Sequence, residues 1–362
     1  MPTDDTNTSP APDKGRSSEA EDFPRPATGG ETPHPPHGTE PTSPGSAGKR
    51  LLFPEVAAKH PEAAARKRLF AVAAGKGGVG KSFITASLAA SFARWGHRTL
   101  AVDADLGCPN LHTWLGLRRT TGGLGSFLKK RAATLEEAAM ETSVPNLSLV
   151  SGARDMLSAP HITHFEKQRL LAHLKKIPSS YVFVDLSAGA SYNTLDIFLA
   201  ADAGIVVSTP EPTAVENLYR FLRAAALRRL FAVSKAKDVV TVLNAAEMMY
   251  GEGKMLSPME IVEEAGRRAP EERAALAEAI ENLDFRLIVN QVRRGEEREL
   301  GEQIATLVRL HLGLKMEYLG AVEQDDDVRE CLLQGKVLAA DFAASAAARS
   351  VQRVADKFFK SL

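Results

Sequence analysis

One motif constrains the fold of this 362-residue chain more than any other feature of its sequence. Residues Gly75–Ser82 read Gly-Lys-Gly-Gly-Val-Gly-Lys-Ser, follow the apolar run Leu69–Ala73 and open the helical pattern Ser82–Trp95. Glycines let the backbone wrap around phosphates, whose charge is met by amide N–H groups and by the positive end of the following helix. The strand, loop and helix context therefore predicts a phosphate-binding loop.

Each residue of this loop is predicted to bind nucleotide. The side chain of Lys81 is expected to reach the β- and γ-phosphates, and the hydroxyl of Ser82 to bind Mg²⁺. The predicted contacts of the loop are Gly75, Lys76, Gly77, Gly78, Val79, Gly80, Lys81 and Ser82.

Short β-rich runs alternate with helical stretches from Arg68 onward. Several of the runs are apolar throughout, as expected for strands that are buried on both faces. The alternation predicts an α/β fold with a doubly wound, mostly parallel sheet flanked by helices. The candidate strands are Leu69–Ala73, Thr99–Val102, Leu147–Val150, Tyr181–Asp185, Ala203–Ser208, Phe285–Val289 and Lys315–Leu319, and the clearest helices are Ser82–Trp95, Phe165–Lys176 and Thr213–Leu230.

The chain divides by composition. Residues 1–50 hold half of the 20 prolines and no Leu, Ile or Val, so we expect a disordered tail there and a P-loop domain over residues 51–362. Residues 232–282 break the alternation with about three helical segments, one of which opens with the capping box Ser257–Glu260. We predict a helical insertion between two strands, which either packs on the core or forms a partner-docking surface.

Overall composition excludes several classes of protein. Hydrophobic residues make up 44% and charged residues 25%, which excludes a wholly disordered or fibrous chain. Lys and Arg number 45 against 45 acidic residues, so no global charge directs the molecule to nucleic acid. Two cysteines, Cys108 and Cys331, favour a reducing cytoplasm over a disulfide framework. No apolar run is long enough for a membrane span or a signal peptide, so we expect neither export nor a transmembrane segment.

Two carboxylate motifs follow predicted strands. Asp103 and Asp105 lie where the second strand should end, and Asp185 ends the strand Tyr181–Asp185. In α/β proteins ligands bind at this carboxyl edge of the sheet. Asp185 is therefore well placed to hold magnesium, and the flexible Gly189 nearby lets its amide approach a γ-phosphate.

Lys76 adds a second lysine directly after the first glycine of the loop. The sequence Lys-Gly-Gly-Val-Gly-Lys-Ser resembles the deviant Walker A loop of the MinD/ParA superfamily of P-loop ATPases. This resemblance implies an ATP-sandwich homodimer in which Lys76 crosses to the partner's nucleotide. It also implies slow Mg-ATP hydrolysis. In this resemblance Asp105 lies in switch I, Val102–Gly107, and positions the attacking water or the magnesium shell, and Asp185 lies in switch II, Asp185–Ala190.

Further matches resemble one branch of this superfamily, the flagellar-number regulators FlhG and FleN. They are the Asp-x-x-Ala-Gly pattern at Asp185, and the Thr-Pro-Glu-Pro-Thr-Ala turn that begins at Thr209. The resemblance implies nucleotide contacts by Glu211 and Pro212 of that turn. Asn290, in Leu287–Val292, corresponds to an asparagine that contacts adenine in relatives. The resemblance covers Arg68 to about Leu338.

The function implied is a cytoplasmic ATP-dependent dimerising switch that positions or numbers a cellular structure and answers to an unidentified activating protein. The alternative is a DNA-partitioning ATPase of the ParA type, which would bind DNA non-specifically through a patch formed by Arg223, Arg228 and Arg229. The C-terminal helix Ala343–Leu362 leaves two interpretations open. It either packs on the sheet or contacts a membrane as a peripheral amphipathic helix, at the inner face of the cell membrane or at a pole.

Overall fold

The computed structural model describes residues 68–152, 162–248, 256–293, 295 and 299–362. The tail predicted over residues 1–50 lies outside the described residues. The division into a tail and a P-loop domain therefore stays a prediction.

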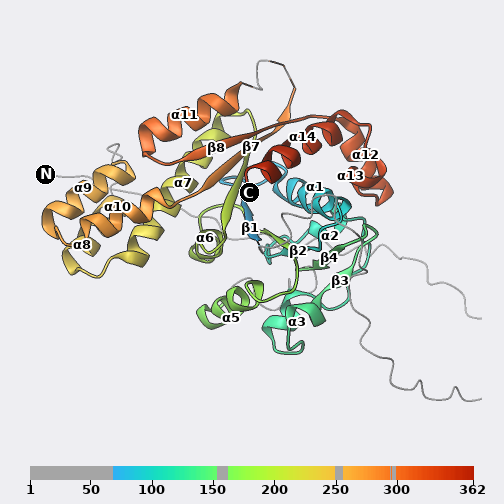
Figure 1. Cartoon of the computed structure of the whole chain (residues 1–362), viewed down its shortest axis with the longest axis horizontal. Helices are drawn as coiled ribbons and strands as arrows, with labels where there is room; N and C mark the ends of the chain where they lie inside the picture. The colour runs from blue at the N-terminus through green and yellow to red at the C-terminus, as the bar shows by residue number, and fades with distance from the viewer. Residues whose placement is uncertain (1–67, 153–161, 249–255, 294, 296–298) are drawn as a thin grey trace, which may run out of the picture. The chain divides into compact units, whose positions relative to one another are not determined.

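A twisted sheet forms the centre of the described fold (Figure 1). Eight strands lie in the order β3-β4-β2-β5-β1-β6-β7-β8, and every neighbouring pair is parallel except the antiparallel pair β3 and β4. The strands are β1 (Arg68–Ala73), β2 (Thr99–Asp103), β3 (Met140–Glu141), β4 (Leu147–Val150), β5 (Tyr181–Asp185), β6 (Ala203–Ser208), β7 (Phe285–Val292) and β8 (Met316–Glu323).

All seven predicted strands are confirmed, and so is the doubly wound α/β class. The edge strand β3 was not predicted, because its two residues carry no periodic pattern. Strands β7 and β8 both run beyond their predicted ends, at Val289 and Leu319. Both extensions bring further residues to the carboxyl edge of the sheet.

Helices cover both faces of the sheet (Figure 1). The described helices are α1 (Lys81–Arg94), α2 (Leu111–Trp114), α3 (Leu124–Leu128), α4 (Leu135–Ala138), α5 (His164–Leu174), α6 (Tyr192–Leu199), α7 (Pro212–Val233), α8 (Lys237–Met248), α9 (Pro258–Arg268), α10 (Arg273–Glu281), α11 (Leu300–Leu312), α12 (Asp326–Gln334), α13 (Leu338–Asp341) and α14 (Ala346–Lys360).

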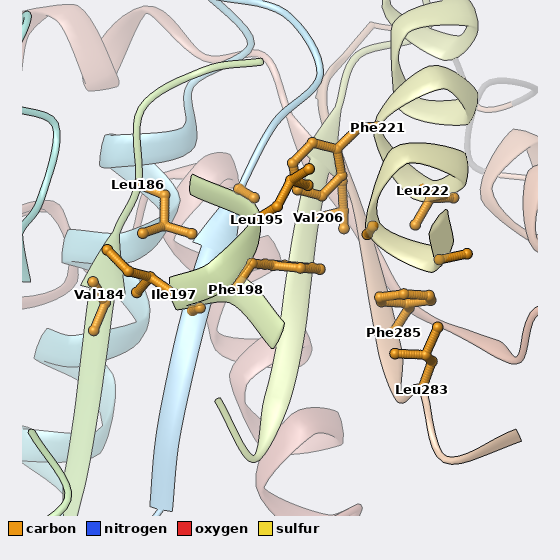
Figure 2. Close-up of a cluster of buried hydrophobic side chains, with 14 of the residues drawn as sticks. Val184, Leu186, Leu195, Ile197, Phe198, Val206, Phe221, Leu222, Leu283 and Phe285 are labelled. Atoms are coloured by element: carbon orange, nitrogen blue, oxygen red, sulfur yellow. The ribbon is translucent and has the colours of Figure 1, made fainter. Parts of the chain in front are cut away.

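Alternation along the strands divides the apolar core into two layers. In β1, Leu69 and Ala71 face one cluster while Phe70 and Val72 face the other. Because successive strand residues point to opposite faces, a strand buried on both sides must be apolar throughout. Figure 2 shows part of the first layer, in which the ring of Phe198 of α6 contacts the rings of Phe221 of α7 and Phe285 of β7.

The insertion lies where the sequence predicted it and is helical. Helices α8, α9 and α10 follow α7 and precede β7, although residues 249–255 lie outside the described part of the chain. Both halves of the capping box expected at Ser257 and Glu260 are present. The buried residues Val239 of α8, Ile261 of α9 and Leu276 of α10 belong to the same core cluster as the sheet, so the three helices pack on the core.

The C-terminal helix is part of the second core layer. Val351, Val354 and Phe358 of α14 are at most 2% exposed. The ring of Phe358 packs against Phe70 of β1 at 4.7 Å between ring centroids. The packed interpretation of the apolar stripe is therefore the one that the structure shows, and membrane contact through the stripe would require the helix to leave the sheet. Within the described ranges no helix has the length and apolar character needed to cross a bilayer.

Candidate functional site

The predicted phosphate loop connects β1 to α1, and its glycines are required by close contacts. Gly80 is the N-cap of α1 with a φ of 86°, in the left-handed region where side chains are strained. A Cβ atom on Gly80 would lie 2.2 Å from Nδ2 of Asn290, and one on Gly75 would lie 2.1 Å from the carbonyl oxygen of Asn217 in α7. Larger residues at either position would push the loop away from β7 or α7.

A buried ion pair links this loop to β5. Nζ of Lys81 donates to Oδ1 of Asp185 at 2.6 Å, and the hydroxyl of Thr85 donates to the same oxygen at 3.1 Å. Asp185 is 0% exposed, and its Oδ2 has no hydrogen-bond partner in the described part of the chain. Burial raises the pKa of Asp185, and the charge of Lys81 opposes that shift. An unpartnered buried oxygen at this position fits a site that takes a further cation or water.

Asp103 and Asp105 follow β2 beside this pair. Oδ2 of Asp103 accepts from the amide of Leu111 at 3.1 Å, and its Oδ1 accepts from the amide of Asp105 at 3.2 Å, so Asp103 holds the switch I turn together. Burial first, and then the negative charge of Asp185, raise the pKa of Asp103 to about 8.

Asp105 lies closer to solvent than Asp103. Its Oδ1 accepts from the hydroxyl of Ser187 at 3.1 Å, which connects switch I to switch II. Its Oδ2 lies 4.0 Å from Nζ of Lys81.

These elements enclose a cavity of about 1060 Å³ at the carboxyl edge of the sheet. This volume is at the upper end of the range for small-molecule sites. The polar lining comes from the phosphate loop, both switches and the ends of β7 and β8, and it includes Lys76, Gly77, Gly78, Gly80, Lys81, Ser82, Asp105, Ser187, Asn290, Gln291, Glu323 and Asp325.

Lys76 lines the cavity from its outer side. Its ammonium donates to the hydroxyl of Thr213, in the first turn of α7, at 3.1 Å. Thr213 was not predicted as a site residue, although it lies in the turn that resembles the FlhG branch. The structure thus joins the additional lysine to this turn through Thr213 and not through Glu211 or Pro212.

Gly189, Glu211 and Pro212, which were also predicted to contact the nucleotide, do not line the cavity. Glu211 accepts a hydrogen bond from the hydroxyl of Thr209, and Pro212 is the first residue of α7. The amide of Gly189, which was expected at a γ-phosphate, donates to the carbonyl oxygen of Ala74 at 2.9 Å. Nucleotide contacts by these three residues stay predictions.

Asn290 contacts the phosphate loop itself. Its Nδ2 donates to the carbonyl oxygen of Val79 at 2.9 Å, and Nε2 of the next residue, Gln291, donates to the carbonyl oxygen of Gly78 at 3.3 Å. Gln291 was not predicted as a site residue. Neighbouring residues of a regular strand point to opposite faces, so a site at Asn290 would place Gln291 on the other side of the sheet.

The residues present fit a magnesium nucleotide. In the described ranges no group of three or more His, Cys, Asp and Glu side chains could hold a metal ion by itself. Magnesium is commonly bound by one or two protein oxygens together with substrate phosphates. The Ser82 hydroxyl, Asp105 and the unpartnered oxygen of Asp185 provide such oxygens beside a loop of backbone N–H groups.

The arginine patch required by the DNA-binding alternative is not formed as expected. Arg223 is 4% exposed, and its guanidinium donates to the carbonyl oxygen of Ala246 at 2.9 Å. Arg228 donates to both carboxylate oxygens of Asp196, at 2.6 and 3.0 Å. Two of the three arginines therefore serve contacts within the protein.

Comparison with known proteins identifies the family. A family model described as the CobQ/CobB/MinD/ParA nucleotide binding domain matches residues 70–338, which is most of the chain. The chain therefore belongs to this family of P-loop nucleotide-binding domains.

Two curated relatives illustrate the range of similarity. The septum site-determining protein MinD of Synechocystis is 33% identical over 156 residues, which are 43% of this chain and 58% of that protein. The flagellum site-determining protein YlxH of Helicobacter pylori is 32% identical over 158 residues, which are 43% of this chain and 53% of that protein. The match to YlxH agrees with the branch expected from the sequence. The chain spans about half the length of the curated relatives it matches.

Solved structures agree on the fold. MinD of Pyrococcus horikoshii, solved as a complex with Mg-ADP, superposes with a TM-score of 0.55 at 20% identity, covering 82% of this chain and 97% of that chain. At this identity the similarity shows the fold alone.

Proposed function

We propose that this chain is an ATP-dependent dimerising switch that hydrolyses Mg-ATP slowly and positions or numbers a cellular structure. The observation that carries the proposal is the cavity that Lys76, Lys81 and Asp105 line together beside the buried Asp185. The names of the relatives, which determine septum and flagellum sites, support the positioning role.

Nucleotide binding is assigned mainly to the loop. The backbone N–H groups of Gly75–Ser82 surround the phosphates, and the ammonium of Lys81 neutralises the β- and γ-phosphates. Lys81 must then share its charge between the phosphates and Asp185, which lies 2.6 Å away. Contacts from Gly189, Glu211 and Pro212, and an adenine contact from Asn290, remain predictions within this proposal.

Ser82, Asp105 and Asp185 would hold the magnesium ion, directly or through water. When bound, the ion neutralises charge on the phosphates during transfer. Asp185 is already fixed by Lys81 and Thr85, so it can hold a water in the ion's shell without rearranging its own strand. Mg²⁺ and ATP are thus the cofactor and substrate that this site fits best.

We assign to Asp105 the role of positioning the attacking water. Its carboxylate lies 4.0 Å from the ammonium of Lys81 and is tied to Ser187, so it can orient a water beside the terminal phosphate. Lys76 is assigned to the partner's nucleotide across a homodimer. To reach it, Lys76 would leave Thr213 of its own chain, a single exposed hydrogen bond that costs little to break.

Partners beyond the homodimer are expected to include an activating protein. Arg223 and Arg228 donate hydrogen bonds to groups within the protein, which supports the dimerising switch over a DNA-partitioning role. The burial of the α14 stripe argues against membrane contact through that helix.

The experiment that tests the proposal is magnesium-dependent ATP hydrolysis by the purified chain. We expect slow turnover in the wild type, and a decrease of about 100-fold in Asp105→Ala because the water loses its orienting base. ATP affinity, measured by calorimetry, should stay close to wild type in that variant. The control is Asp327→Ala, which removes an exposed carboxylate of α12 that does not line the cavity. Equal turnover in wild type and Asp105→Ala would contradict the assignment.

A further inference from the structure

Two consecutive amide side chains at the end of β7 hold two consecutive carbonyl groups of the phosphate loop. Nδ2 of Asn290 lies 2.9 Å from the oxygen of Val79, and Nε2 of Gln291 lies 3.3 Å from the oxygen of Gly78. Asn290 is 4% exposed, so its contact is shielded from competing water. The loop and β7 are more than 200 residues apart in the sequence, and β7 is not the neighbour of β1 in the sheet.

An irregularity in β7 allows both side chains to reach the same loop. The pairing of β7 with β8 shifts between Val289 and Val292, where Val289 lies opposite Ala321 and Val292 lies opposite Glu323. One more residue is therefore present on β7 than on β8 in this stretch. Gln291 has a φ of 59°, in the left-handed region. Such bulges redirect side chains, and strained backbone persists where the surrounding structure requires it.

The two contacts fix the direction of the loop's peptide groups. A peptide whose carbonyl oxygen is held from one side presents its N–H group to the other side, because the two bonds are antiparallel across the planar unit. The carbonyl oxygens of Gly78 and Val79 point to β7, so the following N–H groups, of Val79 and Gly80, point away from β7. A Cβ atom on Gly80 would lie only 2.2 Å from Nδ2 of Asn290, so the absence of a side chain at Gly80 lets the loop pack directly against β7.

We propose that Asn290 and Gln291 are positioning residues that hold the phosphate loop with its N–H groups preoriented for polyphosphate. The inference rests on the proposed function in one respect, that the loop binds the phosphates of ATP. It assigns both residues the role of holding the loop. The sequence motifs predicted an adenine contact for Asn290 and no role for Gln291. An adenine-reading role for Asn290 becomes the rival outcome of the test.

Inorganic tripolyphosphate separates the two roles, because it carries phosphates and no base. Binding of Mg-tripolyphosphate and of Mg-ATP is measured by calorimetry for wild type, Asn290→Leu and Gln291→Met. Both variants remove the amide donor at nearly constant volume. If the amides hold the loop, each variant loses about tenfold in affinity for both ligands, in equal proportion.

Gln303→Met is the matched control. Gln303 is an exposed residue of α11 that does not line the cavity, so this variant removes the same kind of amide away from the phosphate loop. This variant should keep wild-type affinity for tripolyphosphate. Thermal unfolding without ligand reports on folding, and if Asn290→Leu does not fold, the half-buried Gln291 carries the test alone.

Each other outcome overturns the inference. Loss of ATP affinity with unchanged tripolyphosphate affinity would make Asn290 a base reader. Unchanged affinity for both ligands in both variants would make the two contacts incidental. A wild type that binds ATP but not tripolyphosphate would show that the loop is not preoriented. A wild type that binds neither ligand would contradict the proposed function itself, which distinguishes the two failures.

Discussion

Lys81 is the residue at which binding and stability are most closely connected. Its ammonium is buried against Asp185, so the cation that we assign to the phosphates also neutralises a carboxylate in the core. Lys81→Ala should lower ATP affinity by about 100-fold, because a charge-assisted contact to the phosphates is lost. Calorimetry measures the affinity, and Lys175→Ala, at the exposed C-cap position after α5, is the control.

The same substitution leaves Asp185 buried without its cation, so lost affinity could reflect lost folding. The double variant Lys81→Ala/Asp185→Asn removes that charge and should recover thermal stability relative to Lys81→Ala. Affinity close to wild type in a folded Lys81→Ala variant would argue against the assignment of the phosphates to this lysine.

Asp196 of α6 is a second charged residue with a structural role. It accepts from Lys167 of α5 and from Arg228 of α7, and so connects three helices beside switch II. Burial alone would raise the pKa of Asp196, but the hydrogen bonds and charges of Arg228 and Lys167 outweigh it and lower the pKa below 3.8. A carboxyl with a lowered folded pKa stabilises the fold above its unfolded pKa, and that contribution is lost as the pH falls through the folded value.

Asp196→Asn should therefore destabilise the protein by about 3 kcal/mol at pH 7, because two cations lose their carboxylate. The difference from wild type should begin to shrink as the pH falls below 3.8, and it should disappear once the pH is below the lower folded pKa, where the carboxyl of the folded wild type is also neutral. Urea unfolding at a series of pH values measures this difference, with Asp356→Asn at an exposed position of α14 as the control. A difference that does not change with pH would exclude an ionic origin.

At the scale of elements, the hydrophobic pattern of the sequence predicted the elements whose positions depend on the burial of apolar side chains. The apolar runs identified the strands, since a strand covered on both faces must be apolar throughout, and the capping box at Ser257 identified the start of α9. The irregularity at the end of β7 carries no such signal. It depends on a pairing shift between β7 and β8 and on the left-handed backbone of Gln291, and both are set by the neighbouring strand.

The C-terminal helix shows the limit of amphipathic patterns. The same stripe suits a membrane surface and a sheet, and only the structure shows Phe358 enclosed by Phe70 and Phe92. Phe358→Ala should cost about 3–5 kcal/mol of unfolding free energy, because it removes a fully buried ring. Leu310→Ala, which truncates an exposed side chain of α11, should change it little. An unaltered midpoint of chemical unfolding in Phe358→Ala would mean that the helix does not pack on the sheet in solution.

For the whole molecule, the site combines residues that the sequence motifs located with residues that only the fold brings to them. The loop, Asp105 and Asp185 were identified because they lie at or just after the ends of apolar strands and in motifs that resemble those of the family, and parallel strands bring their carboxyl ends to one edge. Thr213, Ser187 and Gln291 were not, because their contacts join segments from 80 to more than 200 residues apart. When the proposed dimer forms, Lys76 would give up its hydrogen bond to Thr213 and contact the partner's nucleotide.

The most direct test of the dimerising switch is the molar mass of Asp105→Ala with Mg-ATP, measured by light scattering during size exclusion, with and without the added substitution Lys76→Ala. The chain has a mass of 39.0 kDa. We predict twice that mass for Asp105→Ala, because bound ATP persists and holds the dimer, and the monomer mass for Asp105→Ala/Lys76→Ala at unchanged ATP affinity. Monomers in both samples, or dimers of equal stability in both, would contradict the claim that Lys76 acts across an ATP-dependent dimer.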